Sequence, residues 1–152
     1  MITHRRFMNI VICASLDFTP QIKNVAAALR ASGHDVTIPR TAGMIINGEV
    51  ALEDIKKEKA TGTIVARTIR QDSIRSYYEK IKHADAILVL NYDKKGIVNY
   101  LGGNTLMEIG FAYVLNKKIY LMNPIPEIEY YKSEIEAVQP IILNGDLNKI
   151  IG

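Results

Sequence analysis

A single carboxylate in an otherwise uncharged segment is the residue best suited to do chemistry. Glu108 is the only charged residue between Lys95 and Lys117, and its neighbours over 106–115 are mostly apolar. A helix that is apolar on nearly all sides is normally buried. A carboxylate there loses its hydration, which is costly unless the group has a partner or a task. Glu108 is therefore a candidate reactive residue.

The loop before Glu108 permits a second interpretation. Gly102, Gly103, Asn104 and Thr105 form a small, polar run. Flexible glycines and the free amides of a helix start can receive a polar or anionic ligand. However, the spacing from Thr105 to Glu108 also fits a capping box, in which the glutamate only satisfies backbone donors. The sequence leaves both roles open.

Further candidate site residues follow predicted strands. Ser15 and Asp17 follow the first strand, where turn formation is their ordinary role, and Phe18 beside them could stack on a base. Asn91 follows a later buried strand. Asp72 is a second candidate acid beside Asp17, although its place before a predicted helix favours an N-cap.

Metal and cofactor motifs are not apparent. His34 and His83 lack partners at metal-ligand spacing, and His4 lies near the N-terminus, so no metal site is predicted. Neither a P-loop nor a Gly-x-Gly-x-x-Gly turn follows the first strand, and no cofactor is predicted. The single cysteine, Cys13, lies in an apolar run and is expected to be a core residue.

Apolar runs and helix signals define the elements that must position these residues. Thr19 and Pro20 begin a helix that Gly33 ends, and Pro39 ends a short strand after it. Ile74, Tyr77, Tyr78 and Ile81 form the stripe of another helix. Strands are predicted at 8–14, 34–38, 85–91, 118–122 and 141–143, further helices near 49–59, around Glu108 and near 130–137, and a long loop at 91–105.

The resulting order is β-α-β-α-α-β-α-β-α-β, which predicts an α/β fold. We expect an open, mainly parallel five-stranded sheet with helices on both faces, a flavodoxin- or Rossmann-like three-layer sandwich. Ligands of such sheets bind beyond the carboxyl ends of the strands where the strand order reverses, usually between the first and third strands. This rule brings together the loop at 14–18 and the loop at 91–105.

Length and composition predict one domain of ordinary type. The chain has 152 residues, 48% hydrophobic and 23% charged, with a net charge of +3. Two of these charges, Arg5 and Arg6, fall in a predicted flexible leader at 1–7, before a single domain at 8–152. The near balance of the remaining charges argues against a nucleic-acid partner. No apolar run reaches the length of a membrane span, and a cytoplasmic protein is expected.

Several motifs from Asp85 to Met122 resemble one family. They are Ala84-Asp85 before a buried strand, Gly103-Asn104-Thr105, Glu108-Ile109-Gly110-Phe111-Ala112, and Lys118-Ile119-Tyr120-Leu121. Together they resemble the core of the nucleoside 2-deoxyribosyltransferase superfamily, which includes the 2′-deoxynucleoside 5′-phosphate N-hydrolases. The first strand with its Ser15 loop is similar to the family's opening.

The resemblance implies a function for the candidate site. It makes Glu108 a nucleophile that attacks the anomeric carbon of a nucleoside or nucleotide and forms a glycosyl ester, which water or a second base resolves. The loop residues named above would line the sugar and base pocket. It also implies a dimer or larger homo-oligomer, in which segments 123–131 or 144–146 of a partner contribute to the site.

The sequence departs from the family pattern at three places. Tyr77 stands where family members usually have an aspartate, so Asp72 or Asp17 would have to protonate the leaving base. Gly102 replaces another common aspartate, and Asp17 replaces an arginine of the phosphate-preferring hydrolases. These departures keep open a non-catalytic nucleotide-binding module. A phosphoacceptor domain and a flavin-binding domain are disfavoured, because this sequence lacks the residues that each would need after the first strand.

Overall fold

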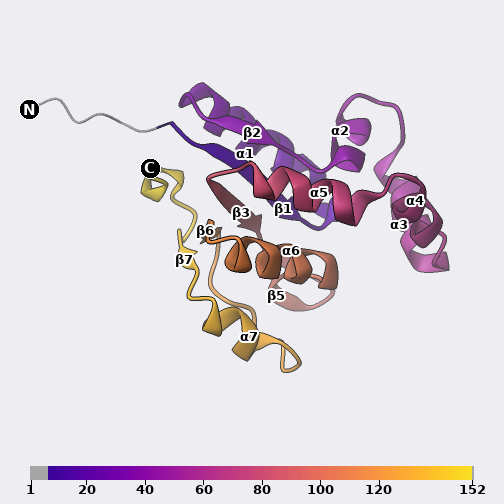
Figure 1. Ribbon diagram of the computed structural model, residues 1–152. Coiled ribbons are helices and arrows are strands. Elements are labelled where there is room, and N and C mark those ends of the chain that lie inside the picture. The colour runs from indigo at the N-terminus through magenta and orange to yellow at the C-terminus, as the bar shows by residue number, and fades with distance from the viewer. Residues whose placement is uncertain (1–6, 152) are drawn as a thin grey trace, which may run out of the picture.

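The computed structural model describes residues 7–151 and has a fully parallel sheet at its centre (Figure 1). The strand order β2-β1-β3-β6-β7 confirms the predicted fold class, including the reversal beside β1 and β3. Residues 1–6 of the predicted leader lie outside the described residues. The five strands are β1 (Asn9–Ala14), β2 (Asp35–Thr37), β3 (Ala86–Leu90), β6 (Lys118–Leu121) and β7 (Ile141–Ile142).

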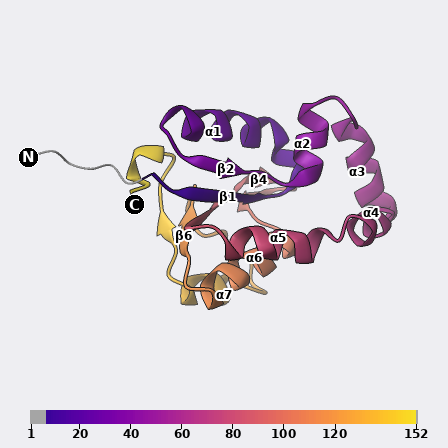
Figure 2. The ribbon, with the colours of Figure 1, turned by 45° about the horizontal axis from the view of Figure 1, so that its top comes forward.

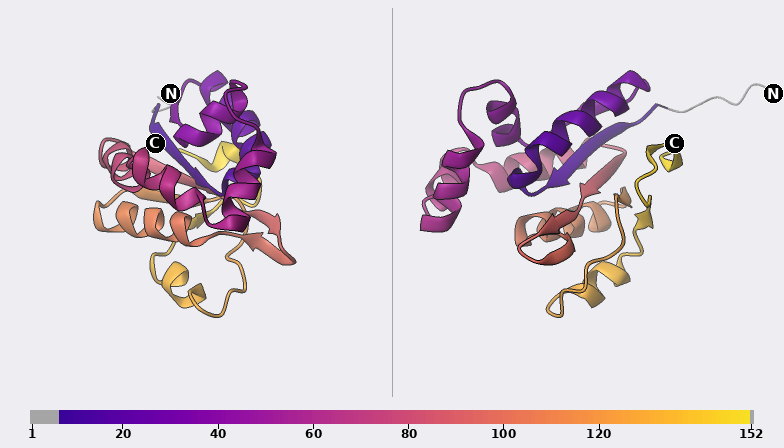
Figure 3. Two further views of the ribbon diagram at one scale, coloured as in Figure 1. Left: turned by 90° about the vertical axis from the view of Figure 1, so that its right-hand side faces the viewer. Right: turned by 180° about the vertical axis from the view of Figure 1, so that it is seen from behind.

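Helices cover both faces of the sheet, as Figure 2 shows. α1 (Thr19–Ala31) and α2 (Arg40–Ile46) pack on one face. On the other face lie α5 (Ser73–Lys82), α6 (Gly103–Val114) and α7 (Lys132–Ala137). A helical hairpin of α3 (Leu52–Thr61) and α4 (Ile64–Arg70) extends away from the sheet (Figures 1 and 3). The predicted three-layer arrangement is therefore present.

Alternation along the central strands divides the core between these two layers. Ile10 and Ile12 of β1 face the α1 side, whereas Val11 and Cys13 face α5 and α6. Because both faces are covered, successive residues of β1 and β3 are apolar without a polar interval, which explains why their runs read as buried strands. Cys13 is fully buried, as expected of a core residue.

Two connections differ from the sequence predictions. The helix predicted near 49–59 is present as α3, but α2 before it and α4 after it were not predicted. The segment 91–105 is not only a loop, because β4 (Tyr92–Lys94) and β5 (Ile97–Tyr100) form an antiparallel hairpin in it. Its turn contains Lys95 and Gly96, with φ of 53° and 73°. These strands are too short and polar to give a periodic signal.

The expectation that the Glu108 helix is buried on all sides is wrong. Met107, Tyr113 and Val114 of α6 are 42%, 53% and 71% exposed. Only one side of α6 packs on the sheet, while Phe111 meets Tyr78 of α5 edge to face at 5.4 Å. Apolar composition thus overstated the burial of this helix, although Glu108 itself lies on its buried side. No helix of residues 7–151 is long and apolar enough to cross a membrane.

Asn91, a predicted ligand-binding residue, ties together the loops that follow β3 and β6. Its side chain is fully buried, and its Nδ2 lies 3.2, 3.1 and 3.1 Å from the carbonyl oxygens of Asn99, Asn123 and Pro124. Its Oδ1 accepts a hydrogen bond from the Asn123 backbone N–H at 2.9 Å. These bonds occupy the amide, so its role in the described fold is structural.

Replacing Asn91 with alanine is expected to destabilise the fold through the loss of these hydrogen bonds. The change leaves several backbone groups without partners in a site closed to water, at a cost of about 2–4 kcal/mol in the free energy of unfolding. Urea unfolding measures this loss. Asn148→Ala, at an exposed position, is the matched control and should change stability by less than about 0.5 kcal/mol. An equal effect of the two substitutions would contradict the tethering role.

Candidate active site

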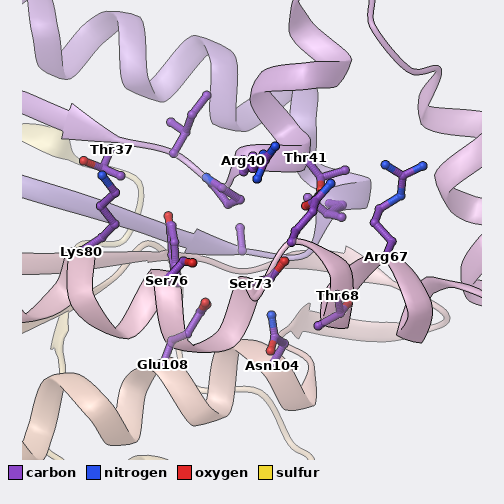
Figure 4. A pocket seen from close by; sticks show the side chains of 16 residues that line it. Thr37, Arg40, Thr41, Arg67, Thr68, Ser73, Ser76, Lys80, Asn104 and Glu108 are labelled. Atoms are coloured by element: carbon purple, nitrogen blue, oxygen red, sulfur yellow. Dashed lines mark hydrogen bonds between the residues drawn. The ribbon is translucent and has the colours of Figure 1, made fainter.

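A pocket of about 370 Å³ lies where the strand order reverses, with Glu108 on its wall (Figure 4). The segment from Thr37 to Thr41 forms the side next to β2 and α2. Side chains of α4 and α5 line the opposite side, and α6 contributes Asn104 and Glu108. The pocket therefore occupies the position that the rule for parallel sheets predicts.

Glu108 does not serve as a helix cap. α6 begins at Gly103 with Gly102 as its N-cap residue, and no side chain caps this end. Thr105 thus lies inside the first turn, and Glu108 lies in the second turn, where backbone donors are already bonded within the helix. The capping-box interpretation is wrong for this reason. The carboxylate is left free for the pocket.

Burial controls the ionisation of Glu108. The residue is only 7% exposed, and this burial raises the pKa of its carboxyl group to about 8. A hydrogen bond from the Cys13 thiol opposes the rise but does not overcome it. Within residues 7–151, Glu108 forms no ion pair. At neutral pH the free protein therefore holds this group mainly in its protonated form.

Tyr77 borders the same pocket but is already engaged. Its hydroxyl donates a hydrogen bond to the Ile12 carbonyl oxygen of β1. Burial, together with the nearby Cys13 and Glu108, raises the pKa of Tyr77 well above its ordinary value. Tyr77 is therefore a neutral phenol whose proton is already donated to the backbone.

Ser15 and Asp17 belong to a separate ion-pair cluster. The Asp17 carboxylate lies 3.1 Å from Lys59 Nζ and 2.9 Å from Lys94 Nζ. Burial acts to raise the pKa of Asp17, but hydrogen bonds and charge from Lys94 and Lys59 outweigh it and lower the pKa. Both lysines also donate to Ser15 Oγ, at 2.9 Å from Lys94 and 3.3 Å from Lys59. Asp17 is therefore held as an anion, which is unsuited to donating a proton.

Asp72 is the N-cap residue of α5 but makes no side-chain capping bond. Its φ of 47° and ψ of 45° place it in the left-handed region. The carboxylate is exposed and lies 3.4 Å from Arg75. Asp72 lines a shallower surface hollow with Arg75 and Phe111, and it is not among the residues that surround Glu108. The predicted N-cap position is correct, whereas a direct part in the Glu108 pocket is not supported.

The remaining predicted residues divide between the pocket and the core. Asn104 lines the pocket beside Glu108. Phe18 is buried and packs edge to face on Tyr92, with ring centroids 5.3 Å apart, so it is not free to stack on a ligand. Thr105 is buried, and Gly102 and Gly103 form the start of α6. Among residues 7–151, no cluster of three or more metal-binding side chains is present.

Sequence reasoning missed the wall formed by α2, α4 and α5. Ser73, Ser76 and Lys80 recur on one side of α5 and line the pocket with Tyr77. Their i, i+3, i+7 spacing is a detectable signal of a shared helix face. Arg40, the first residue of α2, lines the side opposite α5. It was missed because the segment after Pro39 was interpreted as irregular.

Comparisons with known proteins gave one structural match. No protein-family model and no curated protein sequence matches the chain. Among solved structures, the chain is similar to the CMP N-glycosidase BcmB of Clostridium botulinum. The identity is 18%, the alignment covers 90% of each chain, and the TM-score is 0.45.

Replacing Glu108 with glutamine is expected to remove a pH-dependent loss of stability. The folded protein keeps a proton that the unfolded chain releases between pH 4.5 and about 8, so wild-type stability falls as pH rises through this range. At 1.36 kcal/mol per pKa unit, the full effect is roughly 5 kcal/mol. Urea unfolding of both proteins from about pH 4 to about pH 9 measures it.

We expect Glu108→Gln to gain relative stability progressively with pH and then to differ from wild type by a constant amount. Glu129→Gln, at an exposed position, is the control and should follow wild type at every pH. If the difference between Glu108→Gln and wild type does not vary with pH, burial does not govern this carboxyl group.

Proposed function

We propose that the protein cleaves or exchanges the N-glycosidic bond of a nucleoside or nucleotide, with Glu108 as the nucleophile. The observation that carries the proposal is a buried carboxylate, without an ion-pair partner in the described residues, on the wall of a pocket of about 370 Å³. A volume of this order lies in the range of small-molecule sites. The family-like residues around Glu108 give the same assignment.

The proposed reaction has two displacements at the anomeric carbon. A Glu108 carboxylate oxygen attacks C1′, the C1′–N bond breaks, and its electron pair leaves with the base. Water, or a second base, then attacks C1′ of the glycosyl ester and releases the carboxylate. Two displacements retain the configuration at C1′ and avoid a free oxocarbenium ion.

The environment of Glu108 suits a nucleophile. Burial leaves the carboxylate poorly solvated, so little hydration has to be removed when it attacks. No cation of residues 7–151 pairs with it and withdraws its charge. Hydroxyl groups of Thr37, Ser73 and Ser76 line the same pocket and are available to hold sugar hydroxyls or base edges.

A non-catalytic nucleotide-binding module is the second candidate function. Tyr77 at the family's aspartate position favours it, because its hydroxyl is already bonded to Ile12. In that case Glu108 would accept a hydrogen bond from a ribose hydroxyl. We also propose a homo-oligomer, which the exposed apolar side chains of Met107, Tyr113 and Val114 on α6 favour.

Base release is the direct test of the enzymatic proposal. Wild-type protein is incubated with a panel of ribo- and deoxyribonucleosides and their 5′-phosphates, with and without free bases, and released base is measured. We expect Glu108→Gln to lower kcat by about 10³-fold or more. Glu49→Gln, at an exposed position that does not line the pocket, is the control and should equal wild type. An adduct of one sugar or sugar phosphate on wild type by intact mass would identify the ester.

Two results would contradict the enzymatic proposal. One is that wild type releases no base from any member of the panel. The other is that Glu108→Gln turns over as fast as wild type. Tight ligand binding that survives Glu108→Gln, without adduct or turnover, would support the binding module instead.

The pH profile of kcat/KM is expected to follow the ionisation of Glu108. Only the carboxylate can attack, and burial raises the pKa of this group to about 8 in the free protein. The rate constant should therefore rise roughly tenfold per unit at low pH and level off above about 8. Steady-state kinetics across this range measure the profile. A rate that falls as pH rises through the same pKa would indicate that Glu108 acts as an acid.

A further inference from the structure

The pocket contains few groups able to assist a departing base. Its ionisable lining residues are Arg40, Arg67, Tyr77, Lys80 and Glu108. Both acids considered from the sequence lie outside this set. A group of the pocket that balances the charge of the leaving base must therefore be one of its cations or the phenol of Tyr77.

Two of these five groups are already committed to the fold. The Arg67 guanidinium forms a bidentate pair with Glu58, with Nε 2.9 Å from Oε1 and Nη2 2.9 Å from Oε2. The Tyr77 hydroxyl donates to the Ile12 carbonyl oxygen. Glu108 is the proposed nucleophile. The groups that remain are Arg40 and Lys80.

Lys80 differs from Arg40 in its chemistry. A guanidinium stays protonated in proteins, so Arg40 can supply charge but cannot transfer a proton. A lysine ammonium can do both. Within residues 7–151, neither cation has an ion-pair partner, so the charge of each is uncompensated.

Lys80 and Glu108 line the same pocket from two different helices. Lys80 extends from the last turn of α5, and Glu108 rises from α6, with Ser76 between them in Figure 4. The two side chains form no salt bridge, and no lysine lowers the pKa of Glu108. A lysine in contact with Glu108 would neutralise the nucleophile. Since no ion pair joins them within residues 7–151, both groups stay available to a ligand in this pocket.

The geometry points to Lys80 as the residue that stabilises and protonates the departing base, a role that rests on the proposed function. As Glu108 bonds to C1′, the C1′–N electron pair passes to the base, and the Lys80 ammonium donates a proton to the base nitrogen or its conjugated carbonyl oxygen. When water resolves the glycosyl ester, its released proton returns to the Lys80 amine. The site would thus select bases that present an acceptor atom towards α5.

Leaving-group dependence tests this role. Natural nucleosides carry bases that leave poorly without a proton, whereas para-nitrophenolate leaves without one. We expect Lys80→Met to lower kcat on natural substrates by about 10²-fold or more, and to change turnover of a para-nitrophenyl ribofuranoside or deoxyribofuranoside by less than about threefold. Lys82→Met, at an exposed position on α5 that does not line the pocket, is the matched control and should equal wild type on both substrates.

Lys80→Arg separates the two parts of the assignment. Recovery of kcat by arginine shows that positive charge is sufficient, and failure to recover shows that proton transfer is required. Unfolding by urea confirms that the exposed Lys80 variants are folded. Failure to recover supports proton transfer by Lys80, whereas full recovery would overturn the proton transfer and leave Lys80 only the stabilisation of charge on the departing base.

Failure of this inference is distinguishable from failure of the proposed function. If wild type cleaves both substrate classes with dependence on Glu108, but Lys80→Met slows both equally or neither, the inference is overturned and the proposed function stands. An effect of Lys80→Met confined to KM for 5′-phosphorylated substrates would also overturn it, and would make Lys80 a phosphate-binding residue. If wild type cleaves neither class, the proposed function itself is overturned, and the inference with it.

Discussion

The candidate site depends on removing one carboxylate from water. Burial of Glu108 disfavours its charged form strongly enough to raise the pKa to about 8, although a hydrogen bond from the thiol of Cys13 opposes the rise. The surrounding charges are arranged so that they do not cancel this effect. Asp17 is paired with Lys59 and Lys94, and Arg67 with Glu58. These partly buried charges are thus paired with one another, whereas the buried carboxyl group of Glu108 is governed by its environment.

Hydrophobic periodicity was sufficient to predict the five strands of the parallel sheet and their order along the chain. β3 is fully buried, and successive residues of β1 pack on opposite faces of the sheet. Because helices cover both faces, both strands have uninterrupted apolar runs, which indicate a buried parallel sheet. The hairpin of β4 and β5 gave no such signal, because its residues are few and partly polar. The exposed face of α6 was not predictable from composition, since apolar residue types occur on both its exposed and its buried faces.

Polar residues after strands were harder to assign than the strands themselves. Sequence reasoning treated Ser15, Asp17 and Asn91 alike as candidates for ligand contact, but each is engaged with other parts of the protein. Their partners are distant in the chain, as in the pairing of Asn91 with Asn123. The location of the pocket could be predicted from the order of the strands. Which side chains line it depended on which of them form hydrogen bonds or ion pairs elsewhere in the fold. Glu108 and Asn104 were predicted from adjacent residues in the sequence: the small, polar run at 102–105 and the mostly apolar segment around Glu108.

The hairpin of α3 and α4 divides the site between two parts of the chain that can vary separately. Glu108, the proposed nucleophile, is held by α6, whereas Arg67, Thr68 and Gln71 reach the pocket from α4 and its end. Ile55 and the pair between Lys59 and Asp17 attach this hairpin to the rest of the protein. The segment between these attachment points and α5 therefore lines one side of the pocket without contributing to the burial of Glu108. A change in the ligand that this pocket accepts does not require a new position for Glu108.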